Sequence, residues 1–350
     1  MEMTTFFLTR KGVFDLTAKL LEGFQVAAPA TRFSIKHLRP IGYEQIEQVD
    51  LSGYRTVETI KAYAFKPSEK VSEYFGKEMN PPSQKYAILG LRGCDLEGIE
   101  VLDRVFGEGD YPDSFYENSR RNLFLIGADC TDCGKSCFCI LTNGRPYPEK
   151  RFDLNLSPVK EGYVVEAGSQ QGEDFIKSND LLFTPAKEEQ LQEKESNRQR
   201  MIAKLELQNR PFGVKHDLSL THKKNLENKA WKELTKDCVE CSACNFICPT
   251  CSCFLLTDSK PENCFQRDKV WDACLKAGYA RLAGGANPRS KLYQRLQNRY
   301  QCKCDYSFDR LGRYACVGCG RCIDGCAGNI DMRKIFAQLE RLAPLTAKLE

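Results

Sequence analysis

Two short runs of cysteine near the C-terminus constrain the fold of this 350-residue chain more than any other feature. In each run, three cysteines are separated from one another by two residues, and a fourth follows after three further residues. Three thiolates at this spacing can wrap three corners of a compact metal centre from a single tight loop. The first run consists of Cys238, Cys241, Cys244 and Cys248, and the second of Cys316, Cys319, Cys322 and Cys326.

The spacing of both runs is that of bacterial ferredoxins, which bind [4Fe–4S] clusters. In two-cluster ferredoxins, the fourth cysteine of each run serves the cluster that the other run holds. Small residues inside the runs, such as Ser242 and Gly318, let backbone N–H groups approach the sulfurs. The sequence therefore predicts two [4Fe–4S] clusters, one held by Cys238, Cys241, Cys244 and Cys326 and the other by Cys316, Cys319, Cys322 and Cys248.

Zinc is the alternative metal for clustered cysteines. Zinc sites usually combine two separated pairs of ligands and often include histidine. The three histidines of the chain, His37, His216 and His222, lie outside both runs, so iron–sulfur clusters are favoured. The second run departs from the ferredoxin pattern in one respect, because Ala327 rather than proline follows Cys326.

Five further cysteines lie in the N-terminal half at looser spacing. Two apolar runs, residues 86–91 and 123–128, have the length of buried strands, and a cysteine follows each of them closely. In open α/β sheets, ligands bind beyond the carboxyl ends of the strands. Because four cysteines suffice for a cubane, the sequence predicts a third metal site among Cys94, Cys130, Cys133, Cys137 and Cys139.

These signals predict an α+β protein of three parts. Residues 1–185 are interpreted as an α/β domain, with strands at 86–91, 123–128 and 162–166 and a helix for which Asp95 is the N-cap. Residues 186–235 have helical composition and are expected to form a helical connector that includes residues 225–234. Residues 236–350 are predicted to form a ferredoxin-like dicluster domain with a large helical insertion at 254–312.

The overall charge and hydropathy exclude two broad classes of protein. The formal net charge is +4, from 51 basic and 47 acidic side chains, which is too small to indicate nucleic acid. No stretch approaches the ~20 apolar residues of a transmembrane helix, and the apolar cluster at residues 6–8 is too short for a signal peptide. An odd number of cysteines, 19, excludes complete internal disulfide pairing. We therefore expect a soluble, cytoplasmic protein with reduced thiols.

The insertion carries a high density of positive charge. Between residues 281 and 313, eight basic side chains occur with two acidic ones, and Arg289, Lys291, Arg295 and Arg299 recur at helical spacing. The first interpretation is a solvated helix face. Two functional alternatives are a docking face for an acidic partner and positive charge that offsets anionic clusters.

Six cysteines lie outside these sites, and we expect them to pack as reduced thiols around the clusters. A further metal bound by Cys264, Cys302 and Cys304 lacks an obvious fourth ligand. The six are Cys251, Cys253, Cys264, Cys274, Cys302 and Cys304.

Several catalytic motifs are absent from the sequence. No G-x-G-x-x-G follows a predicted strand, and neither a Walker A run nor a G-x-S-x-G elbow occurs. No pair of histidines supplies acid–base chemistry. Flavin, nicotinamide and substrate chemistry are therefore expected in other chains.

Four short segments carry a resemblance to a known family: RGCD at 92–95, CFC at 137–139, CPTCSC at 248–253, and WDAC at 271–274 before the second run. From about residue 89 onward, the chain resembles the iron–sulfur subunits that include the A subunit of anaerobic sulfite reductase and the beta subunit of cytoplasmic sulfhydrogenases (group 3 nickel–iron hydrogenases). The resemblance implies a third [4Fe–4S] cluster, with Cys133 outside the family pattern. Its implied ligands are Cys94, Cys130, Cys137 and Cys139.

The resemblance also implies partners and a function. In this family, a flavoprotein subunit that binds FAD oxidises NAD(P)H, and the iron–sulfur subunit relays the electrons to a catalytic reductase subunit of the sulfite reductase or hydrogenase type. The expected function is electron transfer, without catalysis by this chain alone. Two alternatives stay open: reduction of a substrate at the N-terminal site, with Cys133 as a surplus thiol, and a relay role in another electron-bifurcating or disulfide-reducing complex.

Overall fold

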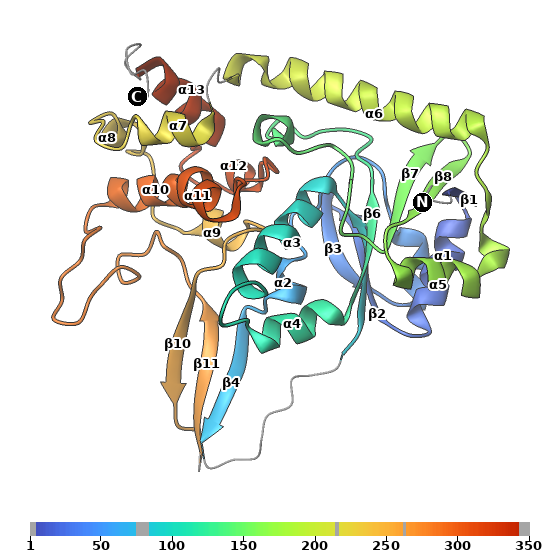
Figure 1. Ribbon diagram of the computed structural model, residues 1–350, viewed down its shortest axis with the longest axis horizontal. Coiled ribbons are helices and arrows are strands. Elements are labelled where there is room, and N and C mark those ends of the chain that lie inside the picture. The colour runs from blue at the N-terminus through green and yellow to red at the C-terminus, as the bar shows by residue number, and fades with distance from the viewer. Residues whose placement is uncertain (1–4, 75–83, 214–216, 262–263, 343–350) are drawn as a thin grey trace.

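An eight-stranded mixed sheet forms the N-terminal half of the computed structural model, which describes residues 5–74, 84–213, 217–261 and 264–342 (Figure 1). Its strands are β1 (Thr5–Thr9), β2 (Gln25–Arg32), β3 (Ile35–Ile41), β5 (Tyr86–Leu91), β6 (Leu123–Ala128), β7 (Leu154–Val159), β8 (Gly162–Ala167) and β9 (Thr184–Pro185). They lie in the order β3-β2-β5-β6-β7-β8-β1-β9. The neighbours from β2 to β7 are parallel, and the remaining pairs are antiparallel.

The central strands are continuous apolar runs because helices cover both faces of the sheet. Helices α1 (Gly12–Leu21) and α5 (Gln170–Ser178) pack on one face, and α2 (Lys61–Ala64), α3 (Gly93–Phe106) and α4 (Ser114–Arg121) enclose a core on the other. The strands predicted at 86–91, 123–128 and 162–166 are confirmed as β5, β6 and β8.

The start of α3 differs from the prediction. Arg92 is the N-cap, and Asp95 lies inside the first turn rather than before it. Its carboxylate accepts a hydrogen bond from the backbone N–H of Arg92 at 3.2 Å. Asp95 therefore closes the first turn from within the helix, because the chain already turns immediately after β5 ends at Leu91.

A second sheet ties the insertion to the N-terminal half. It contains β4 (Ser68–Tyr74), β10 (Phe254–Ser259) and β11 (Phe265–Trp271) in the antiparallel order β10-β11-β4, and it projects from the rest of the molecule in Figure 1. The large helical insertion predicted at 254–312 therefore begins with two strands, because β11 finds a distant partner in β4, and its helices come only after them. Helical structure follows as α10 (Leu292–Gln301), η5 (Cys302–Tyr306) and α11 (Ser307–Leu311).

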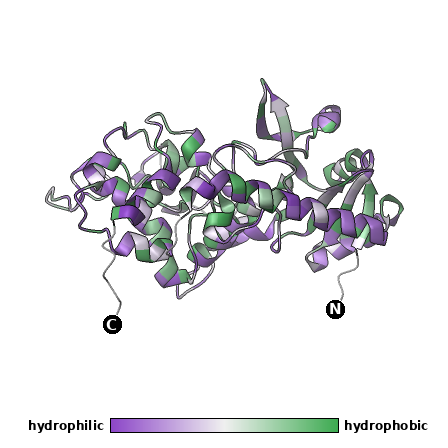
Figure 2. Ribbon diagram, turned by 90° about the horizontal axis from the view of Figure 1, so that it is seen from above, coloured by the Kyte–Doolittle hydropathy of each residue, from purple (hydrophilic) through white to green (hydrophobic). Residues whose placement is uncertain are grey.

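The long helix α6 (Glu188–Asn209) connects the two halves of the molecule. Seen from above, its first turns are mostly hydrophilic, and hydrophobic patches appear toward its C-terminal end (Figure 2). The helical connector continues only in short pieces, α7 (Leu218–Lys223) and α8 (Trp231–Leu234), so a continuous helix at 225–234 is not observed. None of the helices within the described residues combines the length and the apolar composition that crossing a bilayer requires.

The C-terminal half is built from short helices around an aromatic core. Trp231, Tyr300 and Phe336 are each at most 2% exposed, and Trp231 and Phe336 both stack edge-on against Tyr300. Partly buried cysteines of both runs pack against the same core, so the cysteine loops share it.

The remaining short elements of the whole chain are α9 (Ala243–Phe246), α12 (Arg321–Asp324), α13 (Met332–Leu342), η1 (Tyr43–Gln48), η2 (Cys139–Thr142), η3 (Asp180–Leu182) and η4 (Arg210–Phe212).

Candidate metal centres

The first cysteine run folds into a tight loop that leads into α9. Glu240 and Ser242 have φ angles of 55° and 60°, so the backbone curls around the interior of the loop. A narrow cavity lies inside, and the structure places the last cysteine of the second run there beside the first three of the first run. Cys322 also lines this cavity. We call Cys238, Cys241, Cys244 and Cys326 the outer ring.

The second run curls around an adjacent cavity. Gly318 and Gly320 have φ angles of 61° and 73°, which only glycine adopts without strain. The lining of the cavity includes three cysteines of the second run and the fourth cysteine of the first. We call Cys316, Cys319, Cys322 and Cys248 the middle ring.

The N-terminal cysteines gather beyond the carboxyl ends of β5 and β6. Cys94 lies in the first turn of α3, and Cys130 follows β6. A third cavity is lined by all five N-terminal cysteines. The Cys133 thiol also contacts Gln208 Oε1 of α6 at 3.6 Å. We call Cys94, Cys130, Cys137 and Cys139 the N-terminal ring.

The three rings are contiguous. Cys319 lines both the N-terminal and the middle cavity, and Cys322 lines both the middle and the outer cavity. The backbone N–H of Phe138 donates to the carbonyl of Gly318 at 2.8 Å, which joins the loops of two rings. A Cβ atom at Gly318 would lie only 2.4 Å from the Cα of Cys139, so the contact requires glycine.

The basic helix of the insertion is not a solvated face. Arg295 and Arg299 of α10 are each only 3% exposed. Arg295 donates to the carbonyl of Leu275 and pairs with Glu240 at 2.8 Å. Arg299 donates to the carbonyl of Cys244 at 3.0 Å and lines both the outer and the middle cavity. The first interpretation is therefore wrong for these two arginines, which bring positive charge into the protein next to the cysteines.

Further buried cations surround the rings. Lys303 of η5 lines the middle cavity. Burial by itself would lower its pKa, but the combined negative charge of Cys248, Cys251 and Cys302 raises the pKa above its ordinary value. Arg55 donates a hydrogen bond to the carbonyl of Cys319. Arg321 is fully buried and pairs with Asp95 at 2.8 Å. Buried cations are costly unless negative charge lies nearby, so this lining fits anionic groups in the cavities.

The arrangement fits thiolate-held iron–sulfur clusters. Arg299 Nε and Arg321 Nη1 are buried and have no hydrogen-bond acceptor among the described residues. Within the same residues, no three side chains of His, Cys, Asp or Glu converge closely enough to hold a single metal ion. The cysteines instead line the walls of three cavities. Thiolates spread around a cavity in this way can each bind a different iron atom of one multinuclear cluster.

The remaining cysteines have different surroundings. Cys304 is fully buried in the aromatic core, whereas Cys302, two residues earlier, is exposed. Cys264 lies just before β11, where its thiol contacts the carbonyl of Pro261 at 3.6 Å. Cys251 is hydrogen-bonded to Cys248 of the middle ring.

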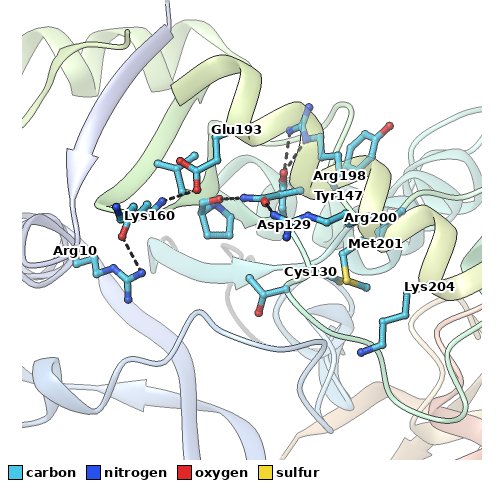
Figure 3. A pocket seen from close by; sticks show the side chains of 15 residues that line it. Arg10, Asp129, Cys130, Tyr147, Lys160, Glu193, Arg198, Arg200, Met201 and Lys204 are labelled. Atoms are coloured by element: carbon cyan, nitrogen blue, oxygen red, sulfur yellow. Dashed lines mark hydrogen bonds and ion pairs between the residues drawn. The ribbon is translucent and has the colours of Figure 1, made fainter. Parts of the chain in front are cut away.

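A larger basic cavity of about 440 Å³ adjoins the N-terminal ring (Figure 3). Cys130 lines both this cavity and that of the ring. Arg198 of α6 pairs with Asp129 at 2.7 Å and with Glu166 at 3.1 Å, and it stacks on Tyr147. The other cationic side chains of the lining are Arg10, Lys160, Arg200 and Lys204.

The α+β fold and the paired cysteine loops define an iron–sulfur protein of the dicluster class, which implies two [4Fe–4S] clusters. Residues 237–330 match the family model of the 4Fe–4S dicluster domain. The chain is 29% identical over 313 residues to sulfhydrogenase 2 subunit beta of Pyrococcus furiosus, with 87% of this chain and 90% of that protein covered. It is thus a homologue of a sulfhydrogenase beta subunit, which confirms the family resemblance seen in the motifs.

Sequence reasoning missed most of the buried cations. Arg321 lies within the second cysteine run and Arg92 within the RGCD segment, so their positions inside motifs were the only available signal. Arg92 is 1% exposed and donates to the carbonyls of Ala128 and Leu51. Arg55 carried no local signal, because it reaches the second run only through the tertiary fold.

Proposed function

We propose that this chain is the electron-transfer iron–sulfur subunit of an oxidoreductase complex and that it holds three [4Fe–4S] clusters. The outer and middle rings hold two clusters in crossed ferredoxin fashion, and the N-terminal ring holds the third. The chain relays electrons from a flavoprotein subunit that binds FAD and NAD(P)H to a catalytic reductase subunit of the sulfite reductase or hydrogenase type.

The contiguity of the three rings carries this proposal. Cys319 and Cys322 each line two neighbouring cavities, so groups held in them lie in a continuous series. At one end of the series, Cys241 is exposed and Val239 is 61% exposed. At the other end, Cys130 opens onto the basic cavity. A relay needs redox groups in a rigid series with access at both ends, and the buried arginines and lysines stabilise the negative charge of reduced clusters.

Iron and acid-labile sulfide per chain test the cluster content. Anaerobically reconstituted protein should contain about 12 of each. Cys137→Ser should lose about four iron atoms, whereas Cys302→Ser, which changes an exposed cysteine outside the rings, should retain the full content. About eight iron atoms in the unaltered protein would contradict the third cluster, and zinc in place of iron would contradict the whole proposal.

Reduction by NAD(P)H tests the relay. The purified chain alone should not be reduced by NAD(P)H, since nicotinamide oxidation needs the flavoprotein. When the chain is affinity-purified from its host together with its partners, NAD(P)H should bleach the iron–sulfur absorption near 400 nm. Direct reduction of the isolated chain by NAD(P)H would contradict this division of labour.

The basic cavity supports a second candidate function, reduction of a small anion at the N-terminal ring. The cavity brings cationic side chains from the turn after β1, from α6 and from the β7–β8 turn beside Cys130. If the chain is catalytic, Cys133→Ser should abolish turnover while all the iron is retained. Unchanged turnover of the complex with Cys133→Ser would favour the relay alone.

A further inference from the structure

Two cysteines outside the three rings are in hydrogen-bond contact with each other. Cys253 immediately precedes β10, and Cys274 follows β11 by three residues. The Asp272 N–H donates to the carbonyl of Cys253 at 3.0 Å and extends the pairing of these strands. The thiol of Cys274 donates a hydrogen bond to the sulfur of Cys253. The strand pairing and this thiol contact place the two side chains next to each other, as a disulfide requires.

The two thiols have unequal surroundings. The hydroxyl of Tyr279 and the backbone N–H of Cys274 also donate to Cys253. The hydrogen bond from the Cys274 thiol outweighs burial and lowers the pKa of Cys253 to about 6, and the same bond raises the pKa of Cys274. Cys253 is half-buried beside Tyr279, which is 38% exposed, whereas Cys274 is buried. An accessible thiolate with a buried thiol partner is the arrangement of reactive cysteine pairs.

A chain of polar contacts joins this pair to the middle ring. The side-chain amide of Asn245 donates to Cys274 at 3.2 Å and contacts the sulfur of Cys251 at 3.8 Å. Cys251 in turn is hydrogen-bonded to Cys248 of the middle ring. Asn245 is only 1% exposed, so the link runs through the interior.

We propose that Cys253 and Cys274 are a redox-active pair that interconverts between dithiol and disulfide beside the middle ring. Oxidation starts from the Cys253 thiolate and the Cys274 thiol: the S–H bond of Cys274 breaks, one S–S bond forms and one proton is released to solvent at the Tyr279 side. Its two electrons pass singly to two one-electron acceptors, the oxidised [4Fe–4S] clusters of the dicluster domain. The pair would thus store two electrons beside one-electron carriers, a role beyond the relay that does not need the third cluster.

Disulfide mapping of the cluster-loaded protein tests the proposal. The protein is poised anaerobically in mixtures of oxidised and reduced dithiothreitol, its free thiols are blocked with N-ethylmaleimide in denaturant, and it is digested without reduction. Mass spectrometry should find the peptides of Cys253 and Cys274 joined, with two hydrogens lost, under oxidising conditions. The link should disappear under reducing conditions. At a given ratio of oxidised to reduced dithiothreitol, the fraction of linked peptide should be the same whether the protein starts oxidised or reduced. Separately blocked peptides at every poise, or a link from Cys253 to another cysteine, would overturn the proposal.

Serine variants separate a redox pair from cluster ligands. Cys253→Ser and Cys274→Ser should each lose the link and retain the iron content of the unaltered protein. Cys302→Ser, which changes an exposed cysteine, should keep both the link and the iron. Loss of about four iron atoms in Cys253→Ser would make Cys253 a cluster ligand and overturn the proposal. Iron content below about 12 atoms per chain in the unaltered protein would instead count against the third cluster and leave this pair unaffected. If a variant does not fold, the disulfide mapping of the unaltered protein still tests the pair.

Discussion

At the scale of single residues, Gly318 determines how closely two cysteine loops approach. Its φ angle is positive, and its carbonyl accepts the hydrogen bond from Phe138 that joins the middle and N-terminal rings. A side chain at this position meets backbone rather than a flexible neighbour, because the atom in the way is the Cα of Cys139. The contact between the two rings therefore requires a residue without a Cβ atom at position 318.

Gly318→Ala should displace the two loops and reduce the iron content. The left-handed backbone alone costs about 1–2 kcal/mol with alanine, and the backbone clash adds about 1–3 kcal/mol. Gly312→Ala is the matched control, since Gly312 has a φ angle of 66° but no atom within 4 Å of its added Cβ. The measurement is the apparent unfolding temperature together with iron per chain. Equal effects of the two variants would show that the ring contact does not matter.

Arg299→Met should lower the reduction potential of a dicluster centre. The guanidinium lies against the outer and middle cavities, where its charge stabilises the more negative, reduced state of a cluster. Loss of a buried charge at this range corresponds to roughly 50–100 mV for one electron. Redox titration followed by electron paramagnetic resonance measures the shift, with the exposed Arg281→Met as the control. Unchanged potentials with full iron content would contradict this role.

The alkylation rate of Cys253 should have an unusual dependence on pH. Its pKa is lowered to about 6, so the reactive thiolate is present above that pH and is lost as the pH falls through it. The rate with iodoacetamide should be half-maximal near pH 6, and Cys274→Ala, which removes the main hydrogen-bond donor, should move the midpoint to higher pH. Half-maximal reaction near pH ~8.5, as for an ordinary thiol, would argue against the hydrogen-bonded pair.

At the scale of elements, the β10–β11 hairpin is anchored by one buried lysine. Lys269 of β11 is 3% exposed and pairs with Glu69 of β4 at 3.2 Å and with Asp113 at 2.7 Å. Asp113 is also the N-cap of α4, because its carboxylate accepts hydrogen bonds from the backbone of the first turn. A single side chain thus connects the insertion to two elements of the N-terminal half.

Lys269→Met should destabilise the protein by about 3 kcal/mol, since the partly buried carboxylates of Glu69 and Asp113 lose their closest counter-charge. The exposed Lys229→Met, in the turn before α8, is the control and should have almost no effect. Thermal unfolding of the cluster-loaded protein measures the difference. A loss below about 0.5 kcal/mol would mean that the hairpin is held by strand pairing alone.

At the scale of the whole molecule, the two halves depend on metal to different degrees. The two cores of the large sheet are built from aliphatic and aromatic side chains, and their residues include no cysteine. The core of the C-terminal half includes partly buried cysteines of both runs, packed together with Trp231 and Phe336. Order in the C-terminal half is therefore expected to require bound clusters, as in other small metal-dependent domains.

Removal of iron by a chelator should loosen the C-terminal half selectively. Without clusters, the buried Arg299 and Lys303 lose nearby negative charge, so local opening there becomes easier. Trypsin cleavage within residues 236–330 should accelerate by about tenfold or more, while cleavage within residues 86–185 changes little. Mass spectrometry of the fragments locates the sites. Equal acceleration in both halves would show that the large sheet also depends on metal.

The sequence by itself determined the features that depend on local spacing. The cysteine runs indicated a dicluster domain because three ligands of each cluster lie within one loop. The strands at 86–91 and 123–128 were visible because a buried parallel strand is a continuous apolar run. Only the tertiary structure decided the features that join distant segments. The pairing of β11 with β4, the burial of Arg295 and Arg299, and the contact of Cys253 with Cys274 depend on neighbours that no local pattern encodes. The spacing of an arginine predicts the helix face on which it lies, but the elements packed against that face decide whether it meets water or a buried negative charge.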